Sequence, residues 1–185
     1  MCQLMKGNGI PTVIMKGTAS AMYYPDPSAR SMGDIDFLVH KADYVRAFQL
    51  MKDNGYYLID ERKSTEHHFE LKKDGFVFEL HCKPVGIRYI TADAYLIGLL
   101  EEGLLKFQEV DIESYLFPVF PDMQNGVILL LHIVQHLRYG LGLRQIIDWM
   151  MYVHQKLHDD TWHGEVHVVY EKIELESMAK IVTRM

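Results

Sequence analysis

Residues 33–39, Gly-Asp-Ile-Asp-Phe-Leu-Val, place two carboxylates two positions apart at the start of an apolar run. In a β-strand, side chains at i and i+2 project from the same face, about 7 Å apart. Asp34 and Asp36 should therefore share one face at the mouth of a strand, while apolar residues fill the opposite face. Carboxylate oxygens without nearby thiolates suit Mg²⁺ or Mn²⁺. The pattern predicts a metal site or, because Asp-x-Asp is short and common, the solvated start of a strand.

A second candidate site lies upstream, where residues 10–15 predict a buried strand that ends at Lys16-Gly17-Thr18. A strand that runs into Gly and a hydroxyl residue at a helix start presents backbone N–H groups and the positive end of the helix dipole, which together bind anions. Lys16 adds a positive charge for phosphate. The alternative is an ordinary strand-to-helix turn that needs Gly17 for its backbone angles.

The third element is residues 76–82, Phe-Val-Phe-Glu-Leu-His-Cys, whose alternation is typical of a strand. It predicts that Phe76 and the other even-numbered residues face inward, with Glu79 and His81 on the other face. A carboxylate inside an apolar strand is costly to bury without a cation or hydrogen-bond partners. Glu79 is therefore a third candidate metal ligand. His81 is a candidate supporting partner or substrate contact, with a structural role as the alternative.

These elements, in this order, resemble the DNA polymerase β-like nucleotidyltransferase superfamily, and in particular its branch of uncharacterised bacterial nucleotidyltransferases. The resemblance covers most of residues 10–84. The motifs that carry it are Lys16-Gly17-Thr18, Tyr24-Pro25, Arg30, Gly33-Asp34-Ile35-Asp36 and Glu79-Leu80-His81. It implies an α+β fold in which a small mixed β-sheet with flanking helices is followed by a C-terminal helical region.

The resemblance also implies an activity. A nucleoside monophosphate would be moved from an NTP to a hydroxyl or amine of a small-molecule or protein acceptor, by in-line displacement with two metal ions. Asp34, Asp36 and Glu79 would be the catalytic residues and would bind Mg²⁺, or Mn²⁺ in its place. The residues expected to bind the nucleotide are Lys16, Gly17, Thr18 and Arg30. For Arg30 the alternative is an ordinary surface arginine.

Two other functions stay open. One is a catalytically weak nucleotide-binding or toxin–antitoxin-type partner protein of the same fold. The three acids favour catalysis over this, because a binding module need not keep mutually repelling carboxylates in one pocket. The other is metal-dependent phosphohydrolysis, which would use a similar acid cluster but gives no reason for Lys16-Gly17-Thr18 to precede it.

Composition limits location and partners. The chain has 185 residues, of which 49% are hydrophobic and 24% charged, which fits one substantial globular domain or two small ones. No apolar run approaches a membrane span, and residues 1–6 lack the layout of a signal peptide. Two cysteines give no disulfide framework, so we predict a cytoplasmic protein without membrane partners. The net charge of −6 disfavours extended nucleic acid as a partner.

Between the motifs, local patterns predict further elements. A helix is expected over residues 43–54, with Val45 on its apolar side, and a hairpin turn is expected at Lys73-Asp74-Gly75. Residues 84–96 are expected to form a loop and a short helix. Because the first expected strand begins near residue 10, an N-terminal helix of longer relatives is expected to be missing.

The second part of the chain is expected to be helical. Tyr115–Pro121 predicts a short extended segment at a boundary between a nucleotidyltransferase-like catalytic domain, residues 1–120, and a helical region, residues 121–185, that forms the far wall of the cleft. One helix is expected from Asp122, and another over 143–157 with Met150 packed inward.

Polar residues of this helical part are candidates for the far side of the site. By analogy with two-part nucleotidyltransferases, Arg138, Arg144 and Asp148 are expected to face the nucleotide or the acceptor, with interhelical ion pairs as the alternative. His132 and His136 have the i, i+4 spacing of zinc enzymes but no Glu in the zincin position, so they predict a polar flank of the cleft.

The neighbouring residues His67 and His68 are expected to point to opposite faces of a strand. Two rings so placed do not bind one ion easily. The pattern therefore predicts solvated or hydrogen-bonded histidines.

Overall fold

The computed structural model describes residues 1–60, 68–83, 93–137 and 140–184. Within these residues, seven strands form one mixed sheet in the order β3-β4-β5-β2-β1-β7-β6. The strands are β1 (Thr12–Ile14), β2 (Ile35–Val39), β3 (Tyr57–Leu58), β4 (His68–Lys73), β5 (Phe76–His81), β6 (Gln108–Ile112) and β7 (Tyr115–Val119). Strand β2 runs antiparallel to β1 and parallel to β5, while β1 runs parallel to β7. The predicted α+β class and mixed sheet are confirmed.

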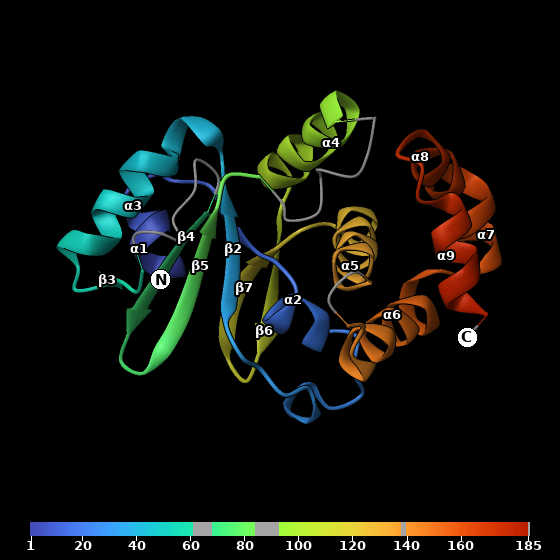
Figure 1. Cartoon of the computed structure of the whole chain (residues 1–185), viewed down its shortest axis with the longest axis horizontal. Helices are drawn as coiled ribbons and strands as arrows, with labels where there is room; N and C mark the ends of the chain where they lie inside the picture. The colour runs from blue at the N-terminus through green and yellow to red at the C-terminus, as the bar shows by residue number, and fades with distance from the viewer. Residues whose placement is uncertain (61–67, 84–92, 138–139, 185) are drawn as a thin grey trace.

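Helices cover both faces of the sheet (Figure 1). On one face lie α1 (Cys2–Gly7) and α3 (Tyr44–Asp53). On the other lie α2 (Gly17–Ala21), α4 (Asp93–Leu105), α5 (Asp122–His136) and α6 (Leu143–Lys156). Farther out are α7 (Asp159–Thr161), α8 (His167–Lys172) and α9 (Glu176–Thr183). The shorter elements are two 3-10 helices, η1 (Pro27–Ala29) and η2 (Lys41–Asp43), and a π-helix, η5 (Trp162–Val166). The two termini therefore lie at opposite ends of the molecule.

Strand β2 separates two hydrophobic cores. Its residues Phe37 and Val39 are buried with side chains of α1 and α3, whereas Leu38 belongs to the core on the opposite face. That second core extends from Val13 in β1 to Val182 in α9, so residues on both sides of position 120 contribute to it. Because side chains alternate along a strand, Asp36 lies on the same face as Leu38, toward the helices that follow β7.

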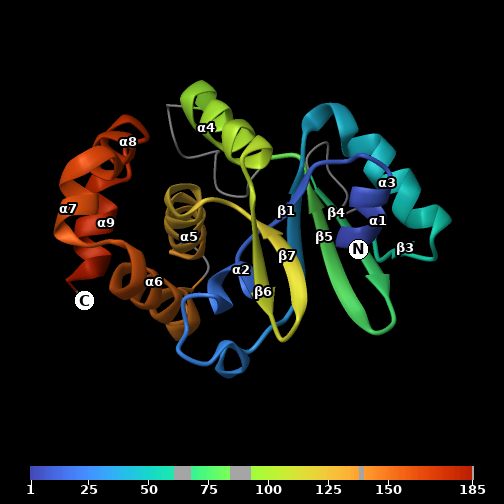
Figure 2. The same ribbon diagram turned by 180° about the vertical axis from the view of Figure 1, so that it is seen from behind.

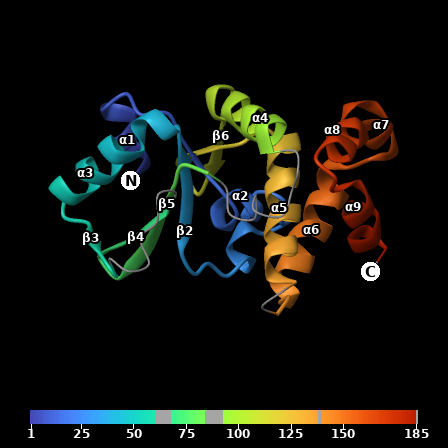
Figure 3. The same cartoon turned by 45° about the horizontal axis from the view of Figure 1, so that its top comes forward.

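Several local predictions are confirmed. Strands β4 and β5 are joined by a two-residue turn in which Asp74 and Gly75 both have positive φ, the geometry of a type I′ hairpin. Helices α5 and α6 form where the apolar periodicity places them and lie side by side (Figure 3). Among the described residues, no helix is long and apolar enough to cross a membrane.

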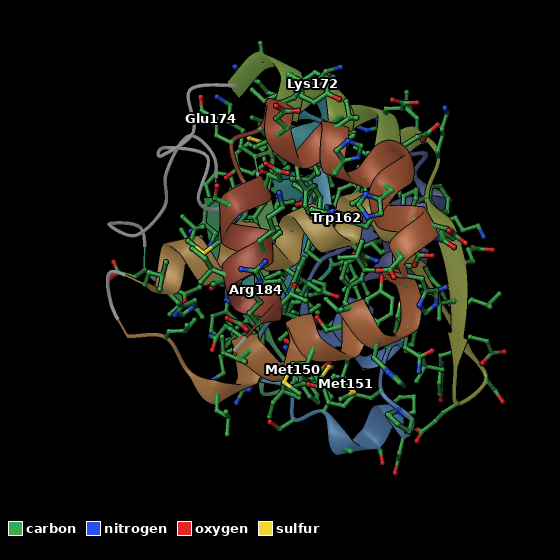
Figure 4. All side chains as sticks on the ribbon, turned by 90° about the vertical axis from the view of Figure 1, so that its right-hand side faces the viewer. Met150, Met151, Trp162, Lys172, Glu174 and Arg184 are labelled. Carbon is green, nitrogen blue, oxygen red and sulfur yellow. The ribbon has the colours of Figure 1, made fainter. Side chains whose placement is uncertain are left out.

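Three side chains predicted to face inward are exposed. Phe76, the first residue of β5 beside the hairpin turn, is 60% exposed. Val45 is 71% exposed and Met150, labelled in Figure 4, is 51% exposed. The buried sides of helices α3 and α6 are narrower than predicted, although Met51 and Trp149, which were also expected to face inward, are fully buried.

The structure adds elements that the sequence did not predict. The segment expected as a boundary is strand β7, which pairs with β1 on one side and β6 on the other, so it lies within the sheet (Figure 2). Strand β6, most of helix α4 and the short helix α1 were not predicted. Of the residues 84–96, positions 84–92 lie outside the described residues.

Gly126 in α5 packs directly against two tyrosines of other helices. A Cβ atom at this position would overlap the hydroxyls of Tyr152 and Tyr170, both buried. We expect Gly126→Ala to lower the free energy of unfolding by about 1–3 kcal/mol despite the better helix propensity of Ala, because a packed core resists added volume. Urea unfolding followed by circular dichroism measures this. Gly98→Ala in α4, which meets no atom within 4 Å, is the matched control and should be neutral or slightly stabilising; equal effects of the two variants would contradict the packing argument.

Candidate functional site

The site is built on the parallel pair β2 and β5. Asp36 lies directly opposite Glu79 in this pairing, and Asp34 lies one residue before β2. Carboxylate oxygens of Asp34, Asp36 and Glu79 all lie within 4.8 Å of one another. Asp34 is exposed, Glu79 is partly buried and Asp36 is only 4% exposed, so the group runs from the surface to the floor of the site. The structure thus brings together the three predicted acids.

Lys16 closes one side of this group. Its Nζ donates a hydrogen bond to Asp36 Oδ1 at 2.7 Å, and both side chains are largely buried. The backbone of Lys16 has φ 51°, in the left-handed region that favours glycine. A lysine held at such a backbone angle, with its ammonium on a buried carboxylate, indicates a functional constraint at this position.

His81 lies between two of the acids. Its ring is 1% exposed, and its Nε2 lies 3.1 Å from Asp36 Oδ1 and 3.3 Å from Glu79 Oε2. On the neighbouring strand β4, His68 pairs with His81 and stacks on it, with ring centroids 4.8 Å apart. Nε2 of His68 lies 3.4 Å from Glu79 Oε2. Two imidazoles therefore flank the carboxylate of Glu79.

Neighbouring charges set the protonation of the acids. Burial, together with the charges of Asp36 and Glu79, raises the pKa of the Asp34 carboxyl. Burial would also raise the pKa of Asp36, but Lys16 and His81 outweigh it and hold that pKa below its usual value. The pKa of Glu79 is likewise held low, against burial, by the imidazoles of His68 and His81. The two inner carboxylates are thus ionised near neutral pH.

The donor set fits a divalent cation. Ionised carboxylates from adjacent strands supply the hard oxygen ligands that Mg²⁺ and Mn²⁺ bind. Asp34, Asp36 and Glu79 are the residues that could hold such an ion, and they converge without any rearrangement of the strands. The Lys16 ammonium occupies Asp36 Oδ1 and would compete with a cation for that oxygen.

The predicted phosphate-binding turn lies beside the acids. Helix α2 begins at Gly17, and both Gly17 and Thr18 are buried. A Cβ at Gly17 would lie 3.8 Å from Nη1 of Arg30 and from the carbonyl oxygen of Asp34. The turn, the arginine and the start of β2 are therefore neighbours, as the order of motifs indicates.

Arg30 is held by a residue from the helical part of the chain. It follows the turn η1 and is 7% exposed. Its Nε and Nη2 donate to the two carboxylate oxygens of Asp148 in α6, at 3.2 and 2.8 Å, and Tyr24 donates to the same carboxylate at 2.7 Å. Arg30 is therefore a buried, bidentate ion-pair partner, and a surface role is excluded.

Of the three polar candidates of the helical part, the structure describes two. Asp148 is 1% exposed and is occupied by Arg30 and Tyr24, so it joins the helical part to the loop before β2. Arg144 is exposed in the first turn of α6. Arg138 lies outside the described residues, as does His67.

Helix α5 supplies the wall that faces Lys16. His132 and His136 lie one turn apart on this helix, with 2.9 Å between their Nε2 atoms. Burial, with the charges of Lys16 and His136, lowers the pKa of His132 to about 3. A neutral imidazole therefore borders the site, in agreement with the predicted polar flank. Within the described residues this pair has no third metal donor nearby.

His68 is the site residue that the sequence analysis did not assign. Its place follows from the hairpin, because the two-residue turn at Asp74-Gly75 pairs residue 73 with 76 and, counting back, 68 with 81. Side chains of directly paired residues project from the same face of a sheet. The predicted hairpin turn alone was therefore sufficient to place His68 beside His81.

Solved structures with the same fold include ANT(2'')-Ia, described as an antibiotic-resistance factor. It matches with a TM-score of 0.62 and 10% identity over 97% of this chain and 90% of that one. The complex of ANT(2'')-Ia with adenylyl-2''-tobramycin matches with a TM-score of 0.60 and 10% identity over 95% and 94% of the two chains. An antigenic nucleotidyltransferase-like protein from Paracoccidioides brasiliensis matches with a TM-score of 0.51 and 17% identity over 96% and 88%. At these identities the likeness establishes the fold.

Comparison with curated proteins gives no match. A protein family described as "Uncharacterised nucleotidyltransferase" matches residues 1–185, the whole length of the chain. Since this match includes the strands that carry the acids and the helices opposite them, the chain belongs to that family of nucleotidyltransferases.

Proposed function

We propose that the chain transfers a nucleoside monophosphate from an NTP to a hydroxyl or amine of an acceptor, with Mg²⁺ held by Asp34, Asp36 and Glu79. The observation that carries the proposal is the convergence of these three carboxylates from two parallel strands, beside a lysine and a strand-to-helix turn. Bound divalent ions would polarise the α-phosphate and stabilise the leaving pyrophosphate.

The chain's own residues have separate tasks in this proposal. Lys16 would move its ammonium from Asp36 to the β- and γ-phosphates, which neutralises charge on the leaving group. Backbone N–H groups of Gly17 and Thr18 would bind the same phosphates. Arg30 would present Nη1 from the side of Gly17, while Asp148 holds its Nε and Nη2 in place. Glu79, kept ionised by the neighbouring imidazoles, would accept the proton of the attacking hydroxyl.

The acceptor is proposed to be a small molecule or a protein. The small-molecule class draws on the adenylylated tobramycin bound to ANT(2'')-Ia, a protein of the same fold. Residues 121–185 would form the acceptor side of the cleft, with His132 and the exposed Arg144 as contacts. An extended nucleic acid is disfavoured by the net charge of −6. We place the reaction in the cytoplasm.

Calorimetric titration of the four NTPs in the presence of Mg²⁺ tests the proposal without knowledge of the acceptor. The wild type should bind at least one NTP with micromolar affinity, and the double variant Asp34→Asn, Asp36→Asn should lose metal-dependent binding because it lacks two anionic ligands. Chelation of Mg²⁺ should abolish wild-type binding in the same way.

The matched control is Asp159→Asn, Asp160→Asn. It removes the same number of charges from two exposed positions in α7, on the outer side of the helical part, and should bind NTP as the wild type does. If the folded wild type binds no NTP, or if both double variants lose binding equally, the transferase proposal fails and the partner-protein alternative gains support.

A further inference from the structure

We propose that His68, Glu79 and His81 form a second cation site, which takes a transition-metal ion of the Zn²⁺ class and leaves one position open. The site shares Glu79 with the three-carboxylate group, but its other two donors are imidazole nitrogens. It requires no nucleotide, so it goes beyond the proposed transferase activity and does not depend on it.

The distances match the shell of a tetrahedral ion. Nε2 of His68 lies 3.4 Å from Glu79 Oε2, and Nε2 of His81 lies 3.3 Å from the same oxygen. Donors that share a tetrahedral Zn²⁺ at bond lengths of about 2.0–2.1 Å lie about 3.3–3.4 Å apart. All three donor atoms are within 4.8 Å of one another. Two of the three donor separations therefore already match, and the two stacked rings would have to turn so that both Nε2 lone pairs meet at the ion.

The sheet holds the two imidazoles on the same side. His68 and His81 are directly paired across β4 and β5, and their rings stack at an interplanar angle of 21°. Because paired residues on neighbouring strands share a face, both rings present Nε2 to the same carboxylate. Two imidazoles and one carboxylate favour Zn²⁺ and related transition metals over Mg²⁺, which prefers oxygen ligands.

An unsatisfied nitrogen gives a second reason to expect a ligand here. Nε2 of His68 is buried and has no hydrogen-bond partner of good geometry among the described residues, although it lies near Glu79. Buried polar atoms in native proteins are nearly always satisfied, so such an atom calls for an explanation. Asp36 Oδ1 is already taken by Lys16 at 2.7 Å. An ion between the imidazoles and Glu79 would satisfy His68 and leave the Lys16–Asp36 pair in place, while His81 Nε2 would exchange its contact with Asp36 Oδ1 for the ion.

Titration of Co²⁺ into the full chain, without nucleotide, tests the site, because tetrahedral Co²⁺ absorbs visible light far more strongly than octahedral Co²⁺. The wild type should give intense bands that saturate at one ion per chain and that Zn²⁺ removes. His68→Ala should weaken binding by at least about tenfold, the scale seen when a metal site loses a supporting group. Glu79→Gln, which keeps the shape of the side chain, should weaken it as well.

His132→Gln, His136→Gln is the matched control, since it removes a second pair of imidazoles whose Nε2 atoms lie 2.9 Å apart, and it should leave the spectrum unchanged. Weak octahedral bands in the wild type, or intense bands that survive both His68→Ala and Glu79→Gln, would overturn the site. Loss of the bands in this control would assign the ion to α5 and would also overturn the proposed site. If the chain binds Co²⁺ but no NTP, only the transferase proposal fails. If it binds NTP but gives no tetrahedral Co²⁺ spectrum, only the second cation site fails.

Discussion

Asp148→Ala should lower the free energy of unfolding by about 3–5 kcal/mol, the range for a buried ion pair that loses one partner. The variant leaves the Arg30 guanidinium, 7% exposed, without the carboxylate that binds its Nε and Nη2. Tyr24 would lose its acceptor as well. Urea unfolding with a two-state fit gives the change, and an unaltered slope of the transition would show that the native state stays compact.

The double variant Arg30→Met, Asp148→Leu is the control for this effect. Replacing both charges by apolar side chains of similar length should restore most of the stability, because no charge is then buried without a partner. A destabilisation below about 1 kcal/mol in Asp148→Ala would contradict the ion-pair role. Asp148 would then have no measurable part in holding the Arg30 guanidinium in place.

Lys16→Met should change two affinities in opposite directions. Without nucleotide, binding of Mn²⁺ should become about 10- to 100-fold tighter, because the cation no longer competes with an ammonium 2.7 Å from Asp36 Oδ1. That range corresponds to about 1.5–3 kcal/mol for a charged hydrogen bond. With Mg²⁺ saturating, binding of NTP should weaken by a similar factor, because the phosphates lose the same ammonium.

Electron paramagnetic resonance of free Mn²⁺ and calorimetry with NTP measure the two affinities. Met keeps a side chain of similar length and the same strained backbone angle as Lys16, so the comparison isolates the charge. Lys106→Met, at an exposed position paired with Glu102, is the control and should change neither affinity. An unchanged affinity for Mn²⁺ in Lys16→Met would show that the lysine does not occupy the cation position.

The three acids were predictable because each depends only on local pattern. Asp34 and Asp36 follow from the two-residue period of a strand, and Glu79 from an interrupted apolar alternation. The mixed sheet itself followed from the resemblance. The sequence also contains a helical periodicity for α4, because its buried leucines recur at helical spacing: Leu96, Leu99, Leu100 and Leu104. Helix α4 was therefore predictable from the sequence.

The local sequence pattern does not predict which residue pairs with Arg30. Arg30 and Asp148 were each singled out, but the sequence gives no reason to pair residues 118 positions apart. The pair forms because α6 packs against α2 and brings a buried carboxylate to the loop before β2. Val45 and Met150 were misplaced for a related reason: the periodicity fixes the apolar side of a helix only approximately, and tertiary packing decides which edge of that side is covered.

The pairing of β2 with β5 also has a consequence for the folding chain. Strands β4 and β5 close through a two-residue turn, a local step that takes microseconds in typical hairpins. Asp36 meets His81 only when segments 45 positions apart join, and non-local pairing of this kind is slow because loop entropy is lost before contacts form. A growing chain therefore carries Asp34 and Asp36 for some time without the strand that completes their site. The chain therefore gains its affinity for a divalent ion only when β2 pairs with β5. A bound ion then stabilises the fully folded chain relative to partly folded ones.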